Sequence, residues 1–142
     1  AHFIVYRLTL PGTILHELSH AFVGWALGAK ILKIRVLEFR GNQLGHVEFQ
    51  CRGSKAVQLI QLGCLSCAPV ITGLIAAILL LQYGLRPELP WYIILLDFYL
   101  LICVIIHMSM SKQDIKNYVR GLFVIYPAAV VFVYIARLSI LR

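Results

Sequence analysis

Four long apolar runs restrict the fold of this 142-residue chain more than any other feature. They cover approximately residues 3–29, 56–83, 89–110 and 119–141. A helix needs about 20 predominantly apolar residues to cross the hydrocarbon core of a bilayer, and each run is long enough. The sequence therefore predicts an all-α membrane protein with about four transmembrane helices, in a single domain over residues 1–142.

The composition favours the same class of protein. Hydrophobic residues make up 61% of the chain and charged residues 13%. Soluble domains average about 45–50% apolar and about 25% charged residues. A water-soluble domain of this size could not bury so much apolar surface. The same values exclude intrinsic disorder, and four cysteines are too few for a disulfide-stapled secreted module.

The segment between the first and second runs, residues 30–52, has a different pattern. A β-branched stretch begins after Lys30, Gly41-Asn42-Gln43 is a turn signal, and a strand-like pattern resumes at Val47. We therefore expect a short β-hairpin at the membrane surface between the first and second helices.

The distribution of basic residues predicts the orientation in the membrane. The formal net charge of +7 does not indicate nucleic-acid binding, because the basic residues gather between the apolar runs. Nine lie in the first and third connections and four on the opposite side, which places the hairpin and the 111–120 connection in the cytoplasm. The nine are Lys30, Lys33, Arg35, Arg40, Arg52, Lys55, Lys112, Lys116 and Arg120; the four are Arg7, Arg86, Arg137 and Arg142.

The segment HELSH, residues 16–20, carries the chemistry. Residues four apart on a helix share one face, so His16 and His20 can offer imidazole nitrogens to a single ion. Glu17 lies about 100° around the helix from His16, within reach of a water on that ion. This is the arrangement of a zinc hydrolase, in which two histidines bind Zn²⁺ and the carboxylate is the general base. The alternative is a polar cluster that satisfies itself between packed helices.

A catalytic zinc site usually has three protein ligands plus water, so one more ligand is needed. The sequence offers His46, Asp97, His107 and Asp114. His46 lies in the hairpin, and Asp97 lies about 10 Å from the outer end of its helix, where pairing with Arg7 is the simpler role. His107 lies about one turn inside the cytoplasmic end of the third run, and Asp114 lies just beyond that end. Spacing alone does not decide whether His107 or Asp114 is the third ligand.

The order of these parts resembles the site-2 protease family of intramembrane zinc metalloproteases over roughly residues 11–120. That family's core runs from a helix with HExxH, through short strands, to two further helices, the last of which brings an aspartate ligand. The resemblance implies that His16, His20 and Asp114 bind one Zn²⁺ and that Glu17 is the general base. The aspartate here follows Ser-Lys-Gln and has no glycine after it, unlike the family's usual Leu-Asp-Gly or Asn-Pro-Asp-Gly setting.

A second similarity lies in the second run. Residues 68–72, Ala-Pro-Val-Ile-Thr, are similar to a Gly-Pro pair followed by an asparagine near the family's active site, with Ala for Gly and Thr for Asn. The resemblance implies that Thr72 contacts substrate.

We therefore expect a zinc-dependent intramembrane endopeptidase that hydrolyses a peptide bond in or near a transmembrane segment of a membrane protein substrate. The edge of the hairpin can hold that substrate extended by strand addition. A divalent-metal transporter is one alternative, although transporters commonly pair such motifs across repeats and no second HExxH is present. A catalytically inactive membrane scaffold is the other. The sequence does not indicate an oligomeric state.

Overall fold

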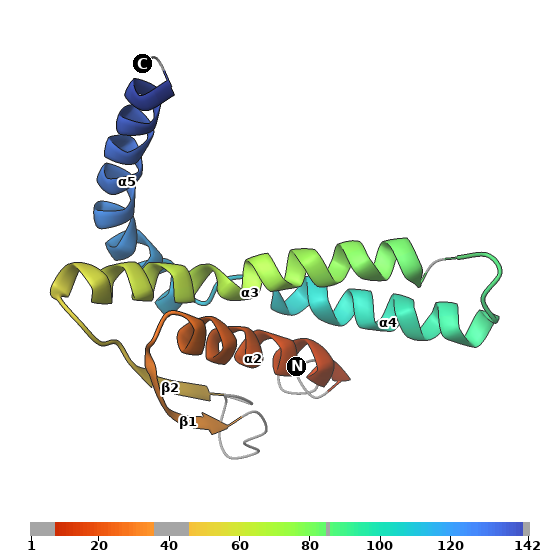
Figure 1. Cartoon of the computed structure of the whole chain (residues 1–142). Coiled ribbons are helices and arrows are strands. Elements are labelled where there is room, and N and C mark those ends of the chain that lie inside the picture. Colours follow the sequence, from red (N-terminus) through yellow and green to blue (C-terminus); the bar gives the residue numbers. More distant parts are fainter. Residues whose placement is uncertain (1–7, 36–45, 85, 141–142) are drawn as a thin grey trace.

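A computed structural model of the chain describes residues 8–35, 46–84 and 86–140. The elements follow one another as α2 (Leu10–Ala26), β1 (Lys30–Arg35), β2 (His46–Gln50), α3 (Lys55–Tyr83), α4 (Trp91–His107) and α5 (Lys112–Ile140) (Figure 1). The protein is thus mostly helical with one small sheet, as the sequence predicts.

Helix α2 is shorter than the 3–29 run that contains it, because the sequence marks both of its ends. Pro11 lies in its first turn, where the missing N–H removes no helical hydrogen bond. Gly28 follows the C-cap residue with a positive φ of 74°, the left-handed conformation that ends many helices. The resulting 17 residues span about 25 Å. The part of the run before residue 8 lies outside the described residues.

The predicted hairpin between the first two helices is confirmed. Strands β1 and β2 pair antiparallel, with Lys30 opposite Gln50 and Arg35 opposite His46, and the register shifts between Ile31 and Lys33. The turn predicted at residues 41–43 lies outside the described residues.

The second run forms α3 almost as predicted, over 29 residues. Ser54 is its N-cap, with the side-chain oxygen accepting a hydrogen bond from the Val57 N–H at 3.4 Å. Pro69 lies inside the helix.

The boundaries of the last two helices differ from the prediction. Helix α4 ends at His107 rather than at residue 110, and α5 begins at Lys112 rather than at residue 119. The early start of α5 follows from Ser111, whose hydroxyl accepts a hydrogen bond from the Asp114 N–H at 3.1 Å while the Asp114 carboxylate accepts one from the Ser111 N–H at 3.0 Å. This reciprocal capping box starts a helix in a polar stretch that hydropathy alone assigns to a connection.

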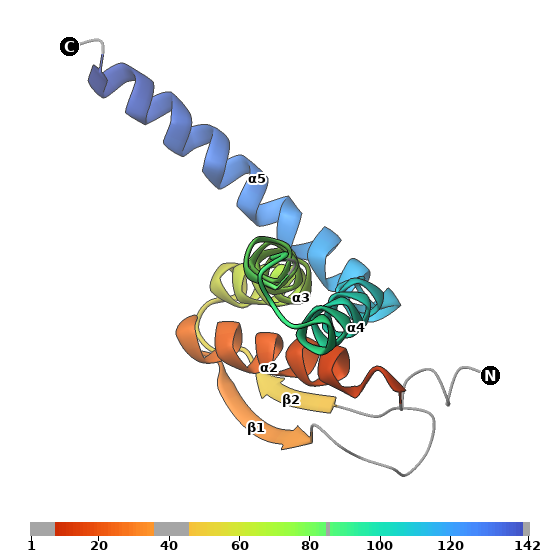
Figure 2. The ribbon, with the colours of Figure 1, turned by 90° about the vertical axis from the view of Figure 1, so that its right-hand side faces the viewer.

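Helices α2, α3 and α4 form a three-helix bundle, with the hairpin on the side of α2 that faces away from α3 and α4 (Figure 2). The first turns of α5 cross α3, and the rest of α5 projects away from the bundle. Glycines allow the closest approaches: a Cβ on Gly12 would collide with the Cys103 carbonyl of α4, and a Cβ on Gly121 would lie 2.6 Å from the Gly63 Cα of α3. These two contacts join α2 to α4 and α5 to α3, and the residues of the site described below lie on these helices.

Two of the described helices are long and apolar enough to cross a membrane. They are α3, with a mean hydropathy of 2.4, and the Lys112–Arg137 part of α5, with a mean hydropathy of 2.0. Helices α2 and α4 have 17 residues each, fewer than the predicted 3–29 and 89–110 runs. Residues 126–135 of α5 are exposed and include large aromatic side chains, such as Tyr126 at 70% and Phe132 at 72%.

Candidate metal site

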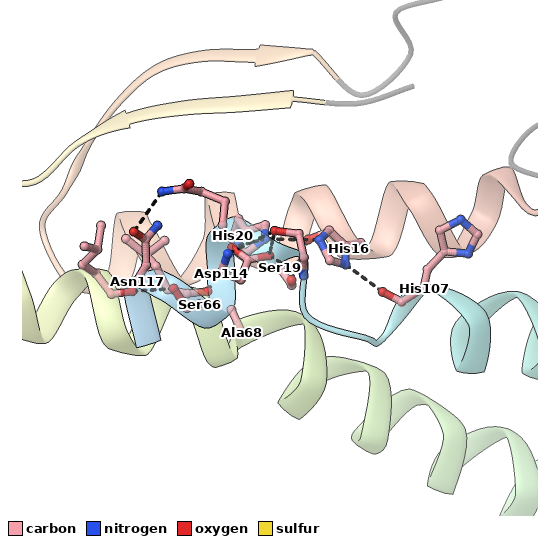
Figure 3. A network of polar contacts seen from close by, with 12 residues as sticks. His16, Ser19, His20, Ser66, Ala68, His107, Asp114 and Asn117 are labelled. Atoms are coloured by element: carbon pink, nitrogen blue, oxygen red, sulfur yellow. Dashed lines mark hydrogen bonds and ion pairs between the residues drawn. The ribbon is translucent and has the colours of Figure 1, made fainter. Parts of the chain in front are cut away.

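Two histidines on α2 face one point. His16 and His20 are one helical turn apart, and their Nε2 atoms lie 3.3 Å from each other. Figure 3 shows both rings on the side of α2 that faces α5 and the end of α4. His20 is buried and His16 is half-buried.

Each ring is held through its other nitrogen by a backbone carbonyl of a different helix. His16 Nδ1 lies 2.7 Å from the carbonyl oxygen of His107, the last residue of α4. His20 Nδ1 lies 3.0 Å from the carbonyl oxygen of Leu65 in α3. Metal-binding histidines characteristically use the nitrogen remote from the ion in this way, which fixes both the ring orientation and the tautomer.

These two hydrogen bonds determine where the lone pairs lie. A carbonyl oxygen can only accept, so each Nδ1 carries the ring proton and donates it. The neutral rings therefore turn two unprotonated Nε2 atoms toward each other. The two atoms lie 3.3 Å apart, and either a proton on one of them or a cation bound by both makes this contact attractive.

Asp114 brings a carboxylate to the same point from α5. Its Oδ1 lies 3.8 Å from His20 Nε2. Its Oδ2 accepts hydrogen bonds from the Ser111 hydroxyl at 2.6 Å and the Ser111 N–H at 3.0 Å. The capping box that begins α5 thus also orients the carboxylate, with one oxygen held by the helix end and the other directed at the histidines.

The donor set fits zinc. Ligand atoms from His16, His20 and Asp114 all lie within 4.8 Å of one another. Two nitrogens that bind one Zn²⁺ tetrahedrally at about 2.0–2.1 Å would lie about 3.3–3.4 Å apart, which matches the separation of the two Nε2 atoms. Two imidazoles and one carboxylate also leave a fourth position open, as in catalytic zinc sites.

His107, the other candidate that spacing left open, lies differently. Its ring points away from His20 and Asp114 (Figure 3). Nδ1 lies 3.0 Å from the Cys103 carbonyl oxygen, and Nε2 lies 3.4 Å from the Thr9 hydroxyl. Nδ1 therefore bonds within α4 and Nε2 bonds to the N-cap of α2, and His107 contributes its backbone carbonyl, not its imidazole, to the site.

The remaining candidates do not join this cluster. Asp97 is buried in α4 against Gly84 at the end of α3, and its proposed partner Arg7 lies outside the described residues. His46 is the first residue of β2.

Glu17 and Thr72 have other surroundings. Glu17 is half-buried on α2, directly after His16. Thr72, on α3, uses its hydroxyl proton within its own helix, donating to the Ala68 carbonyl oxygen at 2.8 Å. Any further hydrogen bond to this side chain must therefore be accepted by the hydroxyl oxygen of Thr72.

Three contributors to the site were missed by sequence reasoning: the Ser111–Asp114 capping box and the backbone carbonyls of Leu65 and His107. The Ser111–Asp114 capping box has a recognisable signal, a serine three residues before an acidic residue at the start of an apolar periodic segment. The two carbonyls have no sequence signal, because every residue carries a backbone carbonyl.

Comparisons of this chain with protein-family models, with curated proteins and with solved structures give no match.

Proposed function

We propose that this chain is a zinc-dependent intramembrane endopeptidase with His16, His20 and Asp114 as the metal ligands. The observation that carries the proposal is that two histidine Nε2 atoms and one carboxylate oxygen converge on one point. The second polar atom of each side chain, Nδ1 in the histidines and Oδ2 in Asp114, makes a hydrogen bond that orients the group. Such support of all three groups is costly to assemble in an apolar bundle and is typical of a metal site.

Zinc bound at this point would polarise the scissile carbonyl and lower the pKa of a water that attacks it. The chain itself supplies the proton transfers. The Glu17 carboxylate takes a proton from the attacking water and then donates it to the amide nitrogen that leaves, so that one water is consumed per bond cleaved. Because Glu17 precedes the second histidine on the same rigid helix, its distance from the site is set by α2.

The substrate follows from the surroundings of the site. His20 lies six residues before Ala26, the last residue of α2, which places it about 9 Å inside that end of the helix, and His16 lies one turn deeper. A hydrolytic site at that depth acts on a substrate that is itself in the membrane. The β-hairpin lies beside α2 and offers an edge to which an extended segment can add, with Thr72 as a further contact.

The proposal includes four membrane-embedded helices with the hairpin and the start of α5 on the cytoplasmic side. Helices α2 and α4, at 17 residues each, lie at the short end of the about 17–25 residues that cross a bilayer. They pack with the longer α3, which supports membrane insertion of the bundle as a unit. The bilayer and a membrane protein substrate are the partners implied.

The test is zinc content together with cleavage. We expect about one zinc per chain in detergent-purified protein, by elemental mass spectrometry, and little in His20→Ala. Glu17→Gln should keep the zinc and abolish cleavage of transmembrane reporter substrates. Glu88→Gln, in the exposed α3–α4 connection, is the matched control and should keep both.

The outcomes separate this proposal from its alternatives. Cleavage by Glu17→Gln would overturn the general-base role. Zinc flux into vesicles that survives Glu17→Gln would instead favour a transporter. Wild-type protein without zinc would favour an inactive scaffold.

A further inference from the structure

Pro69 lies in the interior of α3, and its side chain is among the most completely buried of the described residues. In a regular α-helix the N–H of residue 69 would donate to the carbonyl of Leu65, four residues earlier. Proline has no N–H, so this donor is missing. The Leu65 carbonyl is left available to a donor outside the helix.

That donor is a residue of the candidate metal site. The Leu65 carbonyl oxygen lies 3.0 Å from His20 Nδ1, in a buried contact between residues 45 apart in the sequence. His16 is held in the same way. Its Nδ1 contacts the carbonyl of His107, and this carbonyl has no helical donor because α4 ends at His107. Both histidines thus depend on carbonyls released by interruptions of neighbouring helices.

We propose that Pro69 is a positioning residue of the metal site: by withholding the helical donor from the Leu65 carbonyl, it holds His20 as the Nδ1–H tautomer with its Nε2 lone pair directed at the ion. This inference deepens the proposed function and rests on it for the metal. The role belongs to the missing N–H of Pro69 rather than to its ring, and this distinction makes the proposal testable.

Two variants separate the N–H from the ring. Pro69→Ala restores an N–H that competes with His20 for the Leu65 carbonyl. An ester analogue of that variant, with lactic acid at position 69, has the same methyl side chain and no N–H. We expect the zinc affinity of Pro69→Ala to fall about 10–100-fold, the usual effect of losing a hydrogen bond to a metal-binding histidine. The zinc affinity of the ester analogue should stay near that of the wild type.

Pro127 supplies a matched control, because it lies inside α5 and is exposed, whereas Pro69 is buried. Pro127→Ala should leave zinc affinity unchanged. Equal losses in Pro69→Ala and in the ester analogue would overturn the proposal, since they would assign the effect to the buried ring. Unchanged affinity in Pro69→Ala would overturn it as well.

A second readout does not need the metal. In metal-free protein, ¹⁵N NMR of labelled histidine should show His20 as the Nδ1–H tautomer in wild type and a mixture of tautomers in Pro69→Ala. A wild type that binds no zinc but shows this difference would refute the proposed function and keep the positioning role. A wild type that binds zinc, with the same His20 tautomer in both proteins, would refute the positioning role alone.

Discussion

Asp114 and His107 lie on either side of the short connection between α4 and α5, and their different roles follow from their different hydrogen bonds. Asp114 has one carboxylate oxygen held by Ser111 and the other near His20. The His107 ring bonds to Cys103 and Thr9. A ligand must have a free lone pair directed at the ion, and in this pair of residues only Asp114 has that geometry.

The two residues can therefore be told apart by metal affinity. We expect Asp114→Ala to weaken zinc binding by more than about 100-fold, which exceeds the usual effect of removing a group that only hydrogen-bonds to a ligand. His107→Gln keeps the backbone carbonyl that holds His16, so its zinc affinity should stay close to wild type although its stability falls. Zinc titration of both purified variants is the measurement, and a larger loss in His107→Gln would reverse the assignment.

Ser111 is predicted to act on the metal as well as on the helix. Removing an N-cap hydroxyl costs about 0.5–2 kcal/mol of stability. Ser111→Ala also removes the 2.6 Å hydrogen bond to Asp114 Oδ2, so we expect zinc affinity to fall about tenfold.

Ser54→Ala is the matched control for this prediction. Ser54 caps α3 and accepts from Val57 N–H, and no described contact links it to the site. Its loss should lower the melting temperature without changing zinc affinity. Equal zinc affinity in the two serine variants would show that the cap does not orient Asp114.

At the scale of elements, the crossing of α5 over α3 sets the position of Asp114. Gly121 lies seven residues after Asp114, about 10 Å along the helix. A Cβ there would lie 2.6 Å from the Gly63 Cα and 2.9 Å from the Leu59 carbonyl oxygen, both backbone atoms that cannot rotate away. The two helices must separate to accept any side chain at this position.

Gly121→Ala should therefore weaken zinc binding about tenfold or more, because it moves Asp114 away from the two histidines, which both lie on α2. Val130→Ala, on the exposed part of the same helix, is the control and should bind zinc normally. Circular dichroism in detergent checks that both variants keep their helices. Wild-type affinity in Gly121→Ala would mean that the crossing does not control the site.

The helices and the hairpin could be predicted because each depends on local pattern: apolar runs for the helices, and a turn signal between β-branched segments for the sheet. The boundaries of α4 and α5 could not, because a hydropathy reading takes the polar residues 112–118 for a connection while a side-chain cap makes them helical. The convergence of His16 and His20 follows from helical spacing. Helical spacing does not show whether Asp114 or His107 joins the two histidines, since this depends on how α5 packs against α3.

At the scale of the whole molecule, the described surface is strongly apolar. Large hydrophobic side chains are exposed along α3, α4 and α5, and buried hydrophobic residues are mostly small, such as Ala68 and Ala77. Small residues let helix backbones approach closely while large apolar ones face outward, which is the arrangement of helices packed in lipid. This arrangement supports the proposed membrane topology and makes it testable.

That topology places the hairpin and the α3–α4 connection on opposite sides of the membrane, because α3 runs from one to the other over 29 residues, about 44 Å. Lys33 in β1 and Glu88 in the connection are both exposed and suit labelling. The native cysteines, all free thiols, are first replaced by alanine; they are Cys51, Cys64, Cys67 and Cys103.

In sealed vesicles, a membrane-impermeant maleimide should then modify Lys33→Cys from the cytoplasmic side and Glu88→Cys from the opposite side. The side of Lys33→Cys follows from the excess of basic residues near the hairpin, and the side of Glu88→Cys from a single passage of α3. Labelling of both from the same side would mean that α3 does not span the bilayer. The site on α2 would then lie at the membrane surface, and its substrates would not be restricted to membrane-embedded chains.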